Sequence, residues 1–128
     1  MRALGIQLAI ELFDCDQKIL NDYRLLEQSL VEAATKAGAT VVDSVFHQFN
    51  PHGISGAVII AESHIAIHTW PEYCYAALDI FTCGTDIDPN GIAEEVKYVL
   101  GADRMHVSRI LRGVTVGEQE RSYAQTPT

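Results

Sequence analysis

Strand-like segments are crowded into the middle of this chain, and the two segments with helical periodicity lie far apart on either side of them. Apolar and β-branched residues separated by Pro and Gly predict three or four strands here, at 40–47, 57–61, 63–69 and 75–82. The continuously apolar run at 57–61 predicts a strand covered on both faces. A central group of strands flanked by distant helices predicts an α+β two-layer sandwich, an antiparallel sheet with two helices packed on one face.

Capping residues mark the two predicted helices. Asp16 can cap the start of a long helix, and Gly38 sits where a left-handed residue would end it. Asp88 followed by Pro89 is typical of a second helix start, and Gly101 closes that helix.

The remaining segments complete a single domain. Period-two alternation over 3–13 and the apolar residues of 105–111 predict the first and last strands. We therefore expect one catalytic α+β domain over 1–112 and a loose tail over 113–128. Acidic and polar residues within the first dozen positions fit neither a signal peptide nor a membrane span, so we expect a cytoplasmic protein. The net charge is −8 and no basic patch occurs, which argues against nucleic-acid and membrane partners.

Residues 53–84 hold most of the reactive side chains. Two serines, two histidines, two cysteines, Trp70 and Glu72 lie there between otherwise apolar strands. Polar groups in such a setting must be satisfied by partners or must serve a function. We therefore look for a catalytic or metal site in this segment.

Metal binding is the first candidate chemistry. His64 and His68 are four residues apart, and Cys74 and Cys83 follow. Four steps along a strand separate two side chains by about 13 Å, which one ion cannot bridge. We therefore expect no metal.

A self-generated cofactor is the second candidate. The segment ESHIAIHTWPEYCYAALDIFTCG resembles the signature of the bacterial and archaeal S-adenosylmethionine decarboxylase family. The resemblance extends over 4–112, and it includes the spacing of five residues, Phe49, Ser55, Ser63, His68 and Cys83.

The resemblance implies a pyruvoyl-dependent lyase that supplies the aminopropyl donor for spermidine synthesis. Such a precursor cuts itself between Glu62 and Ser63 into a β chain, 1–62, and an α chain, 63–128. The new α chain begins with a pyruvoyl group made from Ser63. Decarboxylation needs an electron sink, and the pyruvoyl ketone provides one after forming a Schiff base with the substrate amine.

The family pattern also implies residue roles. His68 resembles the base that acts during processing, and Ser55 the group that supports it. Cys83 resembles the acid that protonates the substrate carbon. Phe49 resembles the aromatic that stacks on adenine, Glu72 the acceptor of the ribose hydroxyls, and Trp70 a further contact. We expect structural roles for Cys74 and for the remaining histidines, which are His47, His52, His64 and His106.

Two alternatives stay open at this point. One keeps the fold and the pyruvoyl group but acts on arginine or ornithine. The other is an uncleaved, non-catalytic partner subunit. The intact Ser63, His68 and Ser55 argue against the second alternative.

The distance between Ser63 and His68 along an extended strand predicts how the site is assembled. Ser63 and His68 are five steps apart, or about 16 Å in an extended strand, and they point to opposite faces. Direct proton transfer needs about 3 Å. Either the strand bends sharply at Ser63, or His68 acts on Ser63 of a second copy in a symmetric homodimer, and we favour the dimer.

The Ser63→Ala variant tests self-cleavage. Alanine has no nucleophile, so the variant should remain one full-length band on a denaturing gel. The natural sequence should instead give two bands, for 1–62 and 63–128. A single full-length band from the natural sequence after long incubation would contradict the prediction and favour the non-catalytic subunit.

Overall fold

The described residues of this chain form six strands and two α-helices. The computed structural model describes residues 3–83 and 87–114. Along the chain the elements are β1 (Gly5–Phe13), η1 (Ile19–Asn21), α1 (Tyr23–Lys36), β2 (Val41–Gln48), β3 (Ile54–Ile60), β4 (Ser63–Trp70), η2 (Pro71–Tyr73), β5 (Tyr75–Cys83), α2 (Pro89–Leu100) and β6 (Arg104–Arg112). Most of the predicted tail, 115–128, lies outside the described residues.

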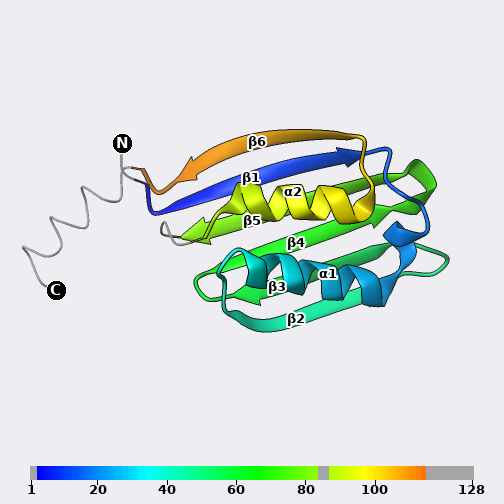
Figure 1. Ribbon diagram of the computed structural model, residues 1–128, viewed down its shortest axis with the longest axis horizontal. Helices are drawn as coiled ribbons and strands as arrows, with labels where there is room; N and C mark the ends of the chain where they lie inside the picture. The colour runs from blue at the N-terminus through cyan, green and yellow to red at the C-terminus, as the bar shows by residue number, and fades with distance from the viewer. Residues whose placement is uncertain (1–2, 84–86, 115–128) are drawn as a thin grey trace, which may run out of the picture.

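The strands form one antiparallel sheet in the order β2-β3-β4-β5-β1-β6. Both helices lie on the same face of it, α1 over β2 and β3, and α2 over β5 and β1 (Figure 1). The predicted α+β two-layer sandwich is confirmed.

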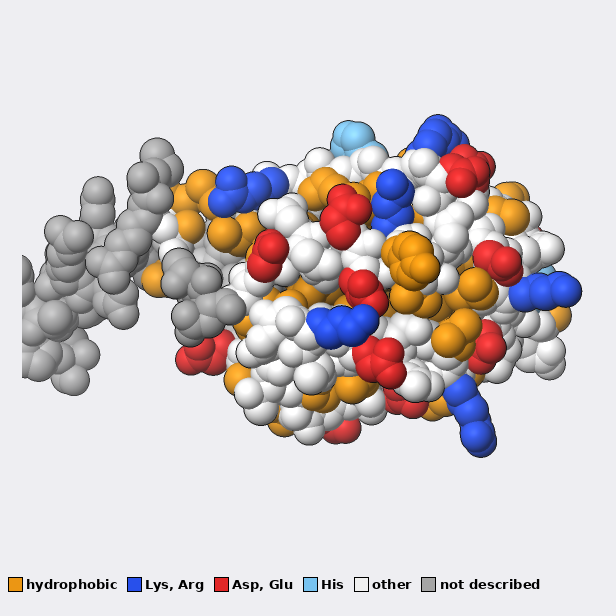
Figure 2. Space-filling view, in the orientation of Figure 1, with side chains coloured by type: hydrophobic (Ala, Val, Ile, Leu, Met, Phe, Trp, Pro, Cys, Tyr) orange, Lys and Arg blue, Asp and Glu red, His pale blue; other side chains and the backbone are white. Residues whose placement is uncertain are grey.

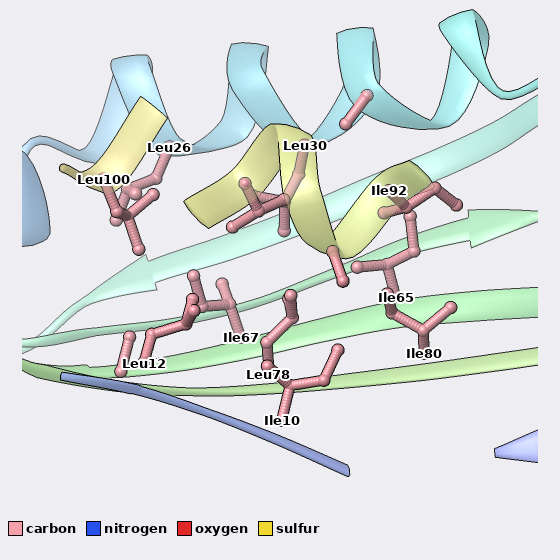
Figure 3. Close-up of a cluster of buried hydrophobic side chains, with 14 of the residues drawn as sticks. Ile10, Leu12, Leu26, Leu30, Ile65, Ile67, Leu78, Ile80, Ile92 and Leu100 are labelled. Atoms are coloured by element: carbon pink, nitrogen blue, oxygen red, sulfur yellow. The ribbon is translucent and has the colours of Figure 1, made fainter. Parts of the chain in front are cut away.

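The core lies between the helices and the inner face of the sheet. Every second residue of β1, β4 and β5 points to this face, and each such side chain is worth roughly 1.5–3 kcal/mol when fully buried. Figure 3 shows these strand residues opposite the helix residues that cover them: Ile10, Leu12, Ile65, Ile67, Leu78, Ile80, Leu26, Leu30, Ile92 and Leu100.

The first helix begins later than predicted. Asp16 accepts bonds from the amides of Lys18 and Ile19, so it starts the short turn η1 and not the long helix. Asp22 caps α1 instead, accepting from the Leu25 amide at 3.1 Å. The two acidic caps therefore divide the predicted helix into two elements.

The other predicted helix boundaries are confirmed. Asp88 caps α2 through the Asn90 amide, and Pro89 is its first residue. Gly101 ends α2 with a φ of 67°, and Gly38 follows α1 with a φ of 91°. Both angles lie in the left-handed region that favours glycine.

The strand predicted at 57–61 is longer, and it is not covered on both faces. It runs from Ile54 to Ile60 as β3, with Ile54, Val58 and Ile60 buried. Ile59 is 43% exposed because both helices pack on the other face. Within the described part of this chain, the helices cover only one face of β3, and the predicted coverage of both faces is not found.

The two faces of the molecule differ in what covers them. Figure 2 shows the helix-bearing face, where acidic and basic side chains are interspersed. The opposite face of the sheet has no helix over it among the described residues. Ser55 and His68, which are cross-strand partners, lie on this uncovered face.

Thr69 connects three elements beneath the site residues of β4. Its buried hydroxyl donates to the Leu20 carbonyl at 2.7 Å and accepts from the Ile54 amide at 3.0 Å. These bonds join η1, β3 and β4, and the neighbouring His68 and Trp70 point to the opposite face.

The Thr69→Val variant should lower the free energy of unfolding by about 2–3 kcal/mol, because a buried amide and a buried carbonyl lose their partner. Thr69→Ser keeps the hydroxyl and should lose only about 1 kcal/mol. Urea unfolding of both variants in a Ser63→Ala background measures this on one continuous chain. Equal losses in the two variants would mean that the methyl group, not the hydroxyl, is what matters.

Candidate active site

The Glu62–Ser63 bond lies at a tight turn. Ile60 pairs with Ser63, so only Ala61 and Glu62 connect β3 to β4. Glu62 has a φ of 64°, a left-handed conformation that costs a residue with a side chain roughly 1–2 kcal/mol. Backbone strain of this kind is concentrated at functional sites. The bond predicted to be cleaved therefore follows directly on a strained, exposed residue.

Ser63 lies beside Cys83. Because β5 runs antiparallel to β4, its end returns to the start of β4. The Cys83 amide donates to Ser63 Oγ at 3.2 Å, and both residues are half-buried. The structure thus brings the predicted pyruvoyl precursor and the predicted proton donor together.

Ser55 and His68 form a second pair. They are opposite each other in β3 and β4, and Ser55 Oγ lies 2.9 Å from His68 Nδ1. The tautomer of the imidazole determines which of the two atoms donates. Next to Ser55, the Phe46 ring occupies the space that a Cβ of Gly56 would take, so only glycine fits there. This close packing joins β2 to β3 behind the pair.

The two pairs lie at opposite ends of β4. Its paired residues show no register shift against β3 or β5, so the strand is extended from Ser63 to His68. Five steps of such a strand span about 16 Å. Within one chain, His68 is therefore far from the Glu62–Ser63 bond.

A pocket of about 260 Å³ adjoins the Ser55–His68 pair. The aromatic side chains of Phe49 and Trp70 are 49% and 40% exposed there. Nine residues line the pocket: Phe49, His52, Gly53, Ile54, Ser55, His68, Thr69, Trp70 and Glu72. The structure thus gathers five predicted site residues in one place and the other three, Glu62, Ser63 and Cys83, in another.

Glu72 presents a charged carboxylate to this pocket. It lies in the first turn of η2, where its own backbone amide and then His52 lower the pKa of its carboxyl group. His52 Nε2 is 2.9 Å from Glu72 Oε2. The carboxylate can therefore accept hydrogen bonds from a ligand at neutral pH.

Two further residues contact this region, His52 and Asn21. The sequence predicts a structural role for His52, and in the structure its side chain contacts Glu72. Asn21 Oδ1 accepts from the Gly53 amide at 3.0 Å and so holds the loop that carries His52. No local pattern relates Asn21 to Gly53, which is 32 residues away. His52, in contrast, is close to Phe49 in the sequence, and this closeness indicates that the two residues lie in the same region.

Cys15 and His64 lie apart from the two pairs and pack against other residues of the chain. Cys15 is buried, and burial, followed by the nearby Cys74 and Asp14, raises its pKa to about 11. His64 stacks on Phe81 with ring centroids 5.9 Å apart. Within 3–83 and 87–114, no three His, Cys, Asp or Glu side chains are grouped as metal ligands would be. No helix in these ranges is long and apolar enough to span a membrane.

Similarity to known proteins agrees with this arrangement. A sequence model of the family described as S-adenosylmethionine decarboxylase matches residues 6–113. The S-adenosylmethionine decarboxylase proenzyme of Thermotoga petrophila is 50% identical over 113 residues, which cover 88% of this chain and 87% of that protein. The proenzyme of Thermosipho africanus is 51% identical over the same length and coverage. The crystal structure of the adenosylmethionine decarboxylase from Aquifex aeolicus matches with a TM-score of 0.76 and 32% identity, covering 89% of this chain and 94% of that one.

The fold and the site define a small α+β protein of one antiparallel sheet, with its reactive side chains at the two ends of a central strand. The family match spans most of the chain, and the relatives are half identical to it over nearly their whole length. The chain belongs to the S-adenosylmethionine decarboxylase family.

Proposed function

We propose that this chain is a proenzyme that cleaves itself between Glu62 and Ser63 and then decarboxylates S-adenosylmethionine. The single observation that carries this proposal is the Ser63 hydroxyl, held by the Cys83 amide directly after the strained Glu62. Family membership supports the substrate, because the relatives are named for S-adenosylmethionine and not for arginine or ornithine.

Self-cleavage uses the chain's own atoms. The Ser63 hydroxyl attacks the Glu62 carbonyl, so that the amide becomes an ester and the Ser63 nitrogen is freed. Removal of the Ser63 α-proton then breaks the ester Cβ–O bond and releases Glu62 as a carboxylate. Addition of water and loss of ammonia leave a ketone at the former Ser63 α-carbon. His68 would take the α-proton, and Ser55 would hold its imidazole by the 2.9 Å contact.

The residues fit a pyruvoyl group at this position. Ser63 is its required precursor, and the Cys83 amide already lies within hydrogen-bond distance of the Ser63 side chain. When formed, the group supplies the electron sink that decarboxylation requires. The Cys83 thiol, on the same residue, would hold the proton that the substrate carbon takes up after carbon dioxide leaves.

Phe49 and Glu72 would bind the nucleoside part of the substrate. The exposed Phe49 ring offers a face for stacking on adenine. The Glu72 carboxylate can accept from both ribose hydroxyls. Trp70, which lies in the same pocket, would complete the apolar wall.

A symmetric homodimer would bring the two ends of β4 together. His68 and Ser55 lie on the uncovered face of the sheet, and the regular β4 ladder argues against a bend that would bring His68 to Ser63 of the same chain. If two copies pack through these faces, each site takes Ser63 and Cys83 from one copy. The other copy then contributes Ser55, His68, Phe49, Trp70 and Glu72.

Release of carbon dioxide tests the substrate. The purified, cleaved protein should release labelled carbon dioxide from carboxyl-labelled S-adenosylmethionine and not from arginine or ornithine. The Ser63→Ala protein is the blank, since it has no electron sink. Release from arginine or ornithine with none from S-adenosylmethionine would overturn the substrate and leave the pyruvoyl chemistry in place.

A mixing experiment tests the shared site. Differently tagged Ser63→Ala and His68→Ala chains are co-expressed, and mixed dimers are isolated by both tags. One of their two sites has an intact Ser63 and an intact His68, so the His68→Ala chain should be cleaved there. His68→Ala alone is the control. Cleavage no faster than in this control would refute the shared site and require His68 to act within its own chain.

A further inference from the structure

Two separate connections of the sheet meet where the His52 side chain contacts the Glu72 carboxylate. His52 lies in the loop between β2 and β3, and Glu72 lies in η2, between β4 and β5. His52 Nε2 and Glu72 Oε2 are 2.9 Å apart, and each side chain is 39% exposed. The pair is thus the direct side-chain contact that joins the loop of Phe49 to the turn that carries Glu72.

The loop that presents His52 is held in place independently of Glu72. The Phe49 amide donates to the Gly53 carbonyl at 2.8 Å, which closes the loop on itself. The Gly53 amide and the Gln48 side chain both donate to Asn21, at 3.0 Å and 3.3 Å to its Oδ1. His52 therefore extends from an anchored backbone, whereas Glu72 extends from the short turn η2, where its own backbone amide is the other partner of its carboxylate.

The pair forms a wall between two pockets. His52 and Glu72 both line the pocket of about 260 Å³ that contains Phe49 and His68. They also both line a neighbouring pocket of about 500 Å³, bounded by Lys18 and Asn21. Without the contact, the Glu72 carboxylate would keep only its own backbone amide as a partner, and it could turn toward the second pocket.

Stability does not account for the pair. Ion pairs between exposed side chains contribute little to the free energy of unfolding, because water screens them and two side chains must be ordered. The contact leaves part of the Glu72 carboxylate unused, since one carboxylate has about four acceptor positions. A fixed carboxylate with spare acceptor capacity is suited to binding two neighbouring hydroxyl groups.

We propose that His52 is a positioning residue, which holds the Glu72 carboxylate in the orientation that receives the vicinal hydroxyls of the substrate ribose. The inference rests on the proposed function and deepens it by naming the residue that organises nucleoside binding. His52 acts through Glu72 and touches no reacting atom. It therefore affects the Michaelis complex and not the chemical step.

Steady-state kinetics with S-adenosylmethionine test the proposal. The His52→Ala variant should raise KM about threefold to tenfold, the factor expected when binding must order one flexible side chain. Its kcat should stay within about twofold of the natural protein, and self-cleavage should proceed at the natural rate. His52→Gln, which retains a side-chain N–H donor, should recover most of the loss. Lys36→Ala is the matched control, because it breaks an exposed contact of similar length, the ion pair to Glu95 at 2.8 Å, on the helix-bearing side.

A double variant separates positioning from a direct contact. Once Glu72→Gln has removed the carboxylate, His52→Ala should change KM little further, because the two residues act as one unit. If the two substitutions raise KM additively, or if His52→Ala lowers kcat and leaves KM unchanged, the positioning role is overturned. The proposed function is unaffected by either result as long as the natural protein turns over S-adenosylmethionine. Absence of that turnover in the natural protein would instead overturn the proposed function itself.

Discussion

The pairing of β4 with both β3 and β5 is the constraint on which the other features of this molecule depend. Ile65 and Ile67 are fully buried beneath the helices, so the register of β4 cannot slip by one residue without exposing both. The same alternation places His64, Ala66 and His68 on the uncovered face. Burial on one side of the strand thereby sets the positions of the reactive groups on the other side and at its ends.

Each half of the candidate site is made by one antiparallel neighbour of β4. The β5 strand returns Cys83 to the start of β4 beside Ser63, and β3 places Ser55 opposite His68 at the other end. A regular strand holds the two halves about 16 Å apart, and no side chain of this size can span that distance. If the chemistry needs both halves, they cannot meet within one chain, because the strand between them is stiff. A second copy of the chain would then have to supply the missing half.

The pocket that contains Phe49 and Glu72 depends on loops, and these are anchored by polar contacts that the strands do not supply. Asn21, the last residue of the turn η1, fixes the backbone next to Gln48 and Gly53. Thr69 joins that turn to β3 and β4 from beneath. Loop residues can adopt many conformations, so these few bonds are what hold the loop beside Phe49 and the end of β4 that precedes η2.

The sequence by itself determined the strands, the second helix, the two-layer α+β class and the family, because each depends on local periodicity, caps or motif spacing. It also predicted that Ser63 and His68 lie on opposite faces, since alternation along a strand needs no knowledge of its neighbours. Only the tertiary structure decided which distant residues contact one another. Asp22 rather than Asp16 caps α1, Ile59 is exposed because both helices share one face, and His52 meets Glu72 through loops 20 residues apart. Contacts of this kind arise from packing between distant segments, which no local pattern along the chain records.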